Sequence, residues 1–163
     1  MTPAESLSLA ARIRLEVERL GQQGVRASAT FGQASSIQDR ERALELAAYE
    51  MATYYSGLER VFEAIANDVD RAPVSGPSWH QELLDRMRVP LKGRRPPVIG
   101  PATGRSLDGL LRFRHVMRSI YAFELDFRRI TEVGELFSAS SADVESELIA
   151  FADFLDRLTG EAA

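Results

Sequence analysis

The chain has 163 residues, near the usual size of one domain, and its 45% hydrophobic and 27% charged residues are an ordinary globular balance. It has no cysteine, which excludes disulfides and thiolate metal sites. Its net charge of −4 argues against a protein that binds nucleic acid over its whole surface, but it allows a local basic groove. The first residues lack a signal-peptide pattern and no stretch approaches the roughly 18 apolar residues of a membrane span, so we expect a cytoplasmic protein without membrane attachment.

Residues 1–36 are expected to form an N-terminal helix and a loop. The helix covers about Ala4 to Leu20, and Gly21 and Gly24 end it or loosen it. The strongest periodicity follows and predicts a long helix from about Ile37 to Asp70. Apolar residues recur along it at alternating steps of four and three, which predicts a stripe that lines a bundle core or a subunit seam. The stripe consists of Leu44, Ala48, Met51, Tyr55, Leu58, Phe62, Ile65 and Val69.

A short helix through Met87 is expected next, with Ser78 as its N-cap. Residues 89–104 contain four proline and three glycine residues, which predicts a long surface loop. Basic residues gather in and just before this loop, where they form either a phosphate-contacting lip or a solvated surface. They are Arg86, Arg88, Lys92, Arg94 and Arg95.

Two further helices complete the pattern. The fourth is predicted over about Ser106 to Thr131, and the last over about Ala142 to Leu158 with Ser140 or Ser141 as its cap. The chain has no period-2 strand pattern. These elements predict a single all-α domain over residues 1–163, an antiparallel bundle of four main helices plus one short helix.

Motifs of several large enzyme classes are missing from the chain. There is no GxxxxGK[ST] phosphate loop, no GxGxxG turn after a strand, no HExxH pair and no cysteine–histidine cluster. The presence of only two histidines and no cysteine argues against a structural zinc site. We therefore expect neither a metal nor a cofactor.

One stretch of the fourth predicted helix carries an unusual density of positive charge, with Arg112, Arg114, His115 and Arg118 inside seven residues. Burying several unpaired cations would cost several kcal/mol each, so some must face water, carboxylates or an anionic ligand. Arg114, Arg118 and Tyr121 lie within about 60° of one another around a helix, and guanidinium groups beside a phenol suit phosphate recognition. The alternative is an arginine-rich face that pairs with acidic residues of neighbouring helices.

The only other histidine, His80, stands beside Trp79 at the start of the short helix. We interpret it as a packing or capping residue at a loop, and the alternative is a contribution to an RNA groove.

The segment Phe113-Arg114-His115, followed after three residues by Ser119-Ile120-Tyr121, resembles the motif of the HepT-like branch of the HEPN family. That motif reads arginine, a polar residue, three variable residues, histidine, any residue and tyrosine. Two earlier stretches, from Tyr54 to Ala66 and from Ser78 to Leu84, resemble the family's second helix and middle section, as does Arg95-Pro96-Pro97-Val98-Ile99. The likeness keeps its order over roughly residues 44–158.

The resemblance implies a HEPN fold and the toxin subunit of a toxin–antitoxin module, which cleaves RNA without metal in a cleft where two subunits meet. It implies a homodimer, an RNA substrate and a nucleotidyltransferase-type antitoxin as partner. Arg114 would bind and polarise the scissile phosphate, and His115 would hold the polar second position. Arg112, Arg118 and the basic loop residues would contact RNA, and Tyr121 would match the tyrosine that the antitoxin modifies with AMP.

The chain departs from the family motif at Ser119, which stands where the family has its histidine. A serine hydroxyl is no general base unless another group deprotonates it. His115 lies one turn earlier and about 40° away around the helix, from where it could take over proton transfer. Three hypotheses remain: an RNA-cleaving enzyme, a degenerate HEPN protein that binds RNA or the nucleotidyltransferase, and a helical scaffold without an RNA role.

Overall fold

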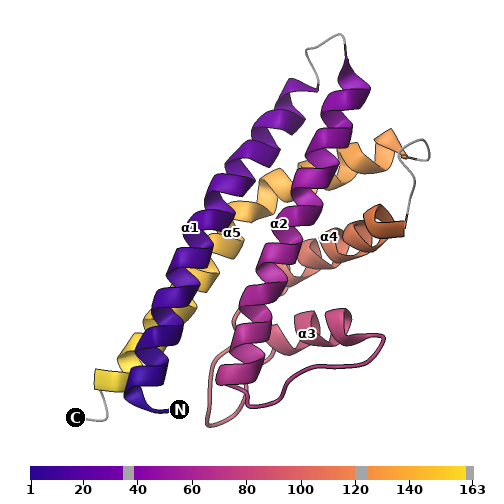
Figure 1. Ribbon diagram of the computed structural model, residues 1–163. Helices are drawn as coiled ribbons and strands as arrows, with labels where there is room; N and C mark the ends of the chain where they lie inside the picture. Colours follow the sequence, from indigo (N-terminus) through magenta and orange to yellow (C-terminus); the bar gives the residue numbers. More distant parts are fainter. Residues whose placement is uncertain (35–38, 120–124, 161–163) are drawn as a thin grey trace.

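The computed structural model describes residues 1–34, 39–119 and 125–160, and these form five helices and no β-strand. The helices are α1 (Pro3–Gln33), α2 (Arg40–Asp68), α3 (Trp79–Met87), α4 (Pro101–Ser119) and α5 (Phe127–Gly160). The long helices α1 and α2 run antiparallel, α5 packs along α1 in the opposite direction, and α3 and α4 lie against the other side of α2 (Figure 1). The predicted all-α bundle of four main helices and one short helix is confirmed.

Helix α1 is longer than predicted, because it continues through both glycines to Gln33. A capping box begins it: the Glu5 amide donates to Thr2 Oγ1, and the Thr2 amide donates to the Glu5 carboxylate. Glycine costs only about 1 kcal/mol inside a helix, and packing against α2 and α5 outweighs that cost here. Gly24 is buried against Tyr54 of α2 and Phe137 of α5, where the missing side chain permits close packing.

The predicted fourth helix over residues 106–131 is wrong at both ends. Helix α4 begins at Pro101, inside the predicted loop, because proline is tolerated in the first turn of a helix, where its missing amide has no partner to lose. Its described part ends at Ser119, and Phe127 to Thr131 belong to α5 instead. The Asp126 carboxylate accepts hydrogen bonds from the amides of Arg128 and Arg129 and so caps the start of α5.

The predicted cap at Ser140 or Ser141 is also wrong, because both residues lie in the middle of α5. Ser140 donates its hydroxyl to the Leu136 carbonyl one turn earlier, a bond that lets serine sit inside a helix. A continuous buried stripe of period 3.6 runs the length of α5 and would have predicted one helix. It comprises Ile130, Val133, Phe137, Ser140, Val144, Leu148, Phe151 and Leu155.

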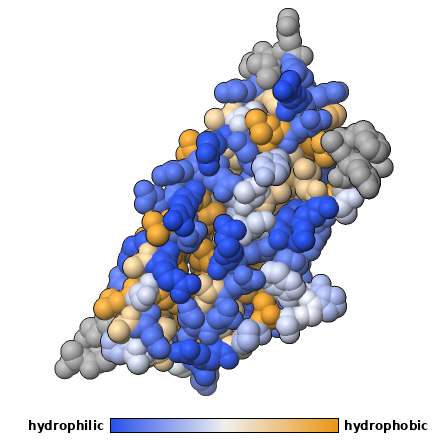
Figure 2. All heavy atoms as spheres, viewed as in Figure 1, coloured by the Kyte–Doolittle hydropathy of each residue, from blue (hydrophilic) through white to orange (hydrophobic). Residues whose placement is uncertain are grey.

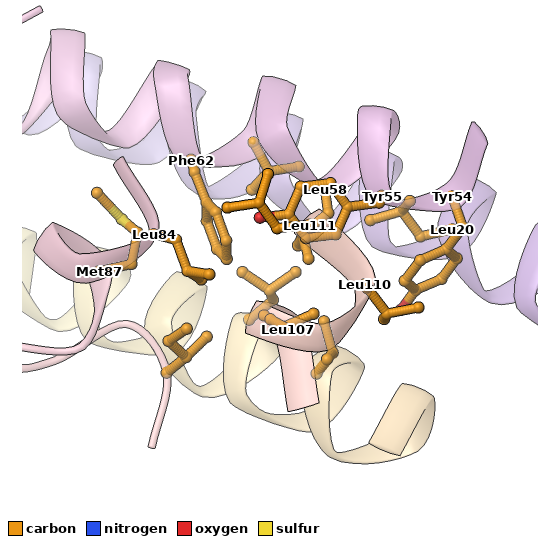
Figure 3. Packing of buried hydrophobic residues seen from close by; sticks show 14 of the residues in the cluster. Leu20, Tyr54, Tyr55, Leu58, Phe62, Leu84, Met87, Leu107, Leu110 and Leu111 are labelled. Carbon is orange, nitrogen blue, oxygen red and sulfur yellow. The ribbon is translucent and has the colours of Figure 1, made fainter. Parts of the chain in front are cut away.

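All five helices contribute to the core, and one part of it lies where α2 faces α3 and α4. Tyr55, Leu58 and Phe62 of α2 point toward Leu84 and Met87 of α3 and toward the leucines of α4 (Figure 3). The whole predicted stripe of α2 is buried, so it lines the bundle core. The face of the molecule seen in Figure 2 is largely hydrophilic, with apolar residues in small groups between the polar ones. None of the described helices is long and apolar enough to cross a membrane.

Helix α3 covers the predicted residues, but the Ser78 side chain makes no capping hydrogen bond. The following loop, residues 89–100, is anchored rather than lying free on the surface. Val98 and Ile99 are buried and their amides donate to the Met87 carbonyl. Arg95 is fully buried and forms a two-point ion pair with Asp70, with Nε 2.6 Å from Oδ1 and Nη2 2.8 Å from Oδ2.

The Asp70–Arg95 pair gives a test of what fixes this loop to the end of α2. Removing one partner of a buried ion pair leaves an uncompensated buried charge, so we expect Asp70→Asn to lower the free energy of unfolding by about 3–5 kcal/mol. Asp68→Asn is the matched control, because Asp68 pairs with Arg12 in the open at 3.1 Å, and we expect it to cost less than about 1 kcal/mol. Urea unfolding of both variants measures the difference, and equal losses would contradict the structural role given to Asp70.

Candidate functional site

A buried carboxylate of α2, Glu59, joins three helices. Its Oε1 lies 2.6 Å from Nδ1 of His80 on α3, and its Oε2 lies 2.8 Å from Nη2 of Arg114 on α4. The side chains of Glu59, His80 and Arg114 are only 5%, 10% and 10% exposed. Charged groups this deep are stable only with partners, and each of the three supplies a partner for another.

The helix spacing explains why Glu59 points inward. It follows Tyr55 by four residues and precedes Phe62 by three, and both of these aromatic residues are core residues. His80 reaches it from the first turn of α3, where its ring stacks on Trp79 at 3.7 Å between centroids. The stacking and the Nδ1 contact together fix the orientation of the His80 ring.

Arg114 is held at two of its three nitrogens. Nε donates to Ser56 Oγ at 2.9 Å, and the Ser56 hydroxyl itself donates to the Ala52 carbonyl. Nη1 is buried and has no hydrogen-bond partner in the described part of the chain. Arg114 also lines a cavity of about 230 Å³ between α2 and α4, together with Ser56 and Arg118. A guanidinium with one unpaired nitrogen beside a cavity is suited to bind an anion.

His115 is exposed, and its ring lies 5.0 Å from the His80 ring in an edge-to-face arrangement. Ser119 is exposed as well, and its hydroxyl lies 3.2 Å from the His115 carbonyl and 3.0 Å from the Val116 carbonyl. The serine hydrogen is therefore directed to the main chain of its own helix. Of the two motif positions, the histidine is the one that adjoins the buried cluster.

Burial raises the pKa of Glu59 to about 7, because desolvation outweighs the nearby positive charge of Arg114. The pKa of His80 is lowered by burial and by the charges of Arg114 and Arg118. The pKa of His115 is lowered by burial, by His80 and by Arg114. The cluster therefore holds a carboxyl group that exchanges its proton near pH 7 beside two imidazoles, and groups of these kinds serve in general acid–base chemistry.

The predicted RNA-binding residues fall into two groups. Arg112 and Arg118 are exposed on α4, and Arg118 lines the cavity beside Arg114. The loop residues lie near the C-terminal end of α2 at Asp68, which is nine residues from Glu59 and so about 13 Å away along the helix axis. Tyr121 lies outside the described residues.

Most of the loop arginines bind the chain itself. Arg95 is buried against Asp70, and Arg94 donates to the Val69 and Asp70 carbonyls. Arg86 donates to the Ala72 carbonyl and to Glu82, and Arg88 donates to the Gly104 carbonyl and pairs with Asp108. Lys92 is exposed. The basic stretch is therefore mainly a structural element, and the expected RNA contact of Arg95 is corrected to a buried ion pair.

Sequence reasoning missed Glu59 and gave His80 a packing role. Glu59 was not included in the predicted stripe, although its spacing from Tyr55 and Phe62 places it among core residues. An acidic residue on an apolar stripe is a signal for a buried charge that needs a partner. The identity of that partner depends on how three helices pack, which no local pattern contains.

Five helices around a shared core, with an arginine–carboxylate–histidine cluster between α2, α3 and α4, define an all-α bundle of the HEPN type. The family model for HepT-like proteins matches residues 46–155, which include Glu59, His80, Arg114 and His115, and the chain belongs to that family. No curated protein and no solved structure matches the chain. Among the described residues, no group of three or more acidic or histidine side chains is placed to hold a metal ion.

The raised pKa of Glu59 determines the direction in which this residue makes the free energy of unfolding change with pH. The folded chain binds this proton more tightly than the unfolded chain, so Glu59 makes the free energy of unfolding fall as the pH rises from 4.5 to about 7. His80 and His115 act in the opposite direction, because their lowered pKa values let the unfolded chain take up protons first as the pH falls.

Direct titration separates these opposing contributions. We expect the side-chain carbonyl carbon of Glu59, followed by NMR, to titrate with a midpoint near pH 7. Arg114→Met should raise the midpoint further, because the guanidinium favours the ionised carboxylate. Arg112→Met, on the exposed side of α4, is the control and should leave it nearly unchanged. A midpoint at the ordinary value of 4.5 would show that Glu59 is solvated rather than buried.

Proposed function

We propose that this HepT-like protein is a metal-independent endoribonuclease, the toxin subunit of a toxin–antitoxin module, whose active site is the cluster around Arg114. The observation that carries the proposal is the environment of that arginine. Its Nη1 is unpaired, it lines a cavity between α2 and α4, and His115 follows it on the helix. The cation and the proton-transfer group that phosphodiester cleavage needs are therefore neighbours.

The chemistry assigns a role to each of these groups. Arg114 binds a non-bridging phosphate oxygen and stabilises the charge that develops when the ribose 2′-hydroxyl attacks phosphorus. His115 accepts the proton of that hydroxyl, and its lowered pKa keeps it neutral and ready to do so at neutral pH. Glu59 holds the arginine through Nη2, and its raised pKa lets it take up a proton when a phosphate approaches, so the charge of Arg114 remains available.

A second candidate function is supported by Ser119. Its hydroxyl is directed to two main-chain carbonyls, so the position at which the family carries histidine supplies no base. On this reading the chain is a degenerate HEPN protein that keeps the anion site at Arg114 and binds RNA or a nucleotidyltransferase without cleavage.

The proposal includes a homodimer with the cavity at or near the subunit contact. Support comes from α2, where Tyr49 lines the cavity and is 67% exposed, and Leu46, one turn earlier, is 51% exposed. Apolar side chains of this size on a helix face beside a functional cavity fit a surface that another chain covers. Arg112 and Arg118 would then extend the positive surface along which RNA lies.

Cleavage of RNA in the presence of EDTA is the first test. We expect the purified protein to cut RNA, and Arg114→Ala to slow cleavage at least about a hundredfold, because it removes the group that stabilises the transition state. Arg105→Ala removes an exposed charge from the same helix and is the control, with a rate close to that of the native chain. Circular dichroism should show that both variants keep the helical fold.

The variant Ser119→His distinguishes the two candidate functions. If the native chain cleaves RNA and Ser119→His raises the cleavage rate by no more than a few-fold, the site with serine at position 119 is active. If only Ser119→His cuts, the native chain has lost catalysis and the binding-module function stands. Cleavage that Arg114→Ala leaves unchanged would remove Arg114 from the site altogether.

The toxin–antitoxin part of the proposal has its own test at Tyr121. We expect protein co-expressed with a nucleotidyltransferase encoded beside it to carry AMP on Tyr121, because the phenol occupies the position of the family's modified tyrosine. Intact-mass and peptide mass spectrometry measure the adduct, and Tyr121→Phe should abolish it. An active partner that leaves Tyr121 unmodified would contradict this regulation without touching the cleavage proposal.

A further inference from the structure

We propose that His80 is a second catalytic residue of the site, the general acid that protonates the leaving 5′-oxygen, and that Glu59 is the residue that positions it. The inference rests on the proposed ribonuclease function and adds a group from a different helix, outside the arginine–histidine motif. Cleavage of a phosphodiester needs a proton donor for the leaving oxygen as well as an acceptor for the attacking hydroxyl. His115 supplies only one of these two roles.

The geometry prepares His80 for proton transfer at one nitrogen. Nδ1 is joined to Glu59 by a hydrogen bond of 2.6 Å, and the ring is stacked on Trp79. Nε2 has no hydrogen-bond partner among the residues that the structure describes. A carboxyl group at Nδ1 orients the ring and can exchange a proton with that nitrogen, which leaves Nε2 as the nitrogen that exchanges a proton with substrate.

The closeness of the His80 and His115 rings gives the two histidines different protonation states and therefore different roles, one as acid and one as base. Their rings lie 5.0 Å apart, so two positive charges there repel each other and the pair holds a single proton over an intermediate pH range. Arg114 and Arg118 add positive charge, and Glu59 and Glu63 add negative charge around His80. His80 lies 2.6 Å from the Glu59 carboxyl group and can share a proton with it, so we assign the single proton of the histidine pair to His80.

Glu59 strengthens this assignment because it retains a proton up to about pH 7, so the Glu59–His80 pair carries one proton in the neutral range. His115 is exposed and has no carboxylate contact of this kind, so it is the neutral partner that acts as base. Its exposed side chain can also rotate away from His80, which gives a phosphate room to approach both rings.

The step balances in atoms and electrons. The 2′-oxygen forms a bond to phosphorus while its proton passes to His115, and the bond between phosphorus and the 5′-oxygen breaks. The 5′-oxygen keeps the bonding pair and takes the proton from Nε2 of His80. The products are a 2′,3′-cyclic phosphate and a free 5′-hydroxyl, and nothing is oxidised or reduced.

A leaving group that needs no proton tests the acid role. The assay compares an ordinary dinucleotide with one whose bridging 5′-oxygen is replaced by sulfur, because a thiolate leaves without protonation. We expect the His80→Ala variant to cleave the oxygen substrate at least about a hundredfold more slowly than the native chain does. The same variant should cleave the sulfur substrate at a rate within a few-fold of the native rate. His115→Ala should slow both substrates alike.

Two further variants distinguish the acid role of His80 from a purely structural effect of its substitution. His80→Gln keeps a polar side chain of similar length against Glu59, and we expect the same pattern of rescue by sulfur. Glu59→Gln should show partial rescue, together with loss of the pH dependence near 7 on the oxygen substrate. Gln81→Ala, the exposed neighbour of His80, is the control and should leave both rates within twofold of native.

The outcomes separate the inference from the function on which it rests. If the native chain cleaves neither substrate, the ribonuclease proposal fails and His80 has no reaction to serve. If the native chain cleaves but His80→Ala matches it on the oxygen substrate, or loses both substrates equally in a folded protein, the acid role of His80 is overturned while the ribonuclease function stands.

Discussion

The rest of the site depends on one interaction, the pairing of the buried Glu59 carboxylate with groups from two other helices. Each oxygen faces a different helix, so the same side chain fixes His80 on α3 and Arg114 on α4 relative to α2. A carboxylate in this position is stable only if both contacts are made, and the contacts therefore couple the packing of three helices to the geometry of the site. The Asp70–Arg95 pair is a second buried ion pair, and it joins the loop between α3 and α4 to the segment that follows α2.

The burial that orders the cluster also sets its chemistry. Desolvation raises the pKa of Glu59 to about 7 and lowers those of both histidines, which removes the usual gap between a carboxyl group and an imidazole. The guanidinium of Arg114 lies beside these groups, so the cluster combines a cation with groups that can exchange protons. The Arg12–Asp68 pair on the surface differs from it, because both of its side chains are solvated.

The fold could be predicted largely from local patterns, and its errors have local causes. The period of the apolar stripe located α2 within a few residues, whereas Pro101 and Ser140 were interpreted as breaks although both are tolerated at their positions in a helix. The site was harder to predict, because its central contacts join residues 21 and 55 positions apart along the chain. The motif on α4 pointed to Arg114 and His115, and nothing in that motif could reveal that a carboxylate of α2 and an imidazole of α3 would meet them.

The three-helix cluster changes how the serine at position 119 is interpreted. A linear motif describes one helix, and on that helix the replacement of histidine by serine removes a base. The site, however, is built by three helices, and its second imidazole comes from α3 with a buried carboxylate behind it. On the proposed mechanism, proton transfer is carried by His115 and His80. Substitution of Glu59 would then disturb both His80 and Arg114, whereas the Ser119 hydroxyl contacts only main-chain carbonyls of its own helix among the bonds that the structure describes for it.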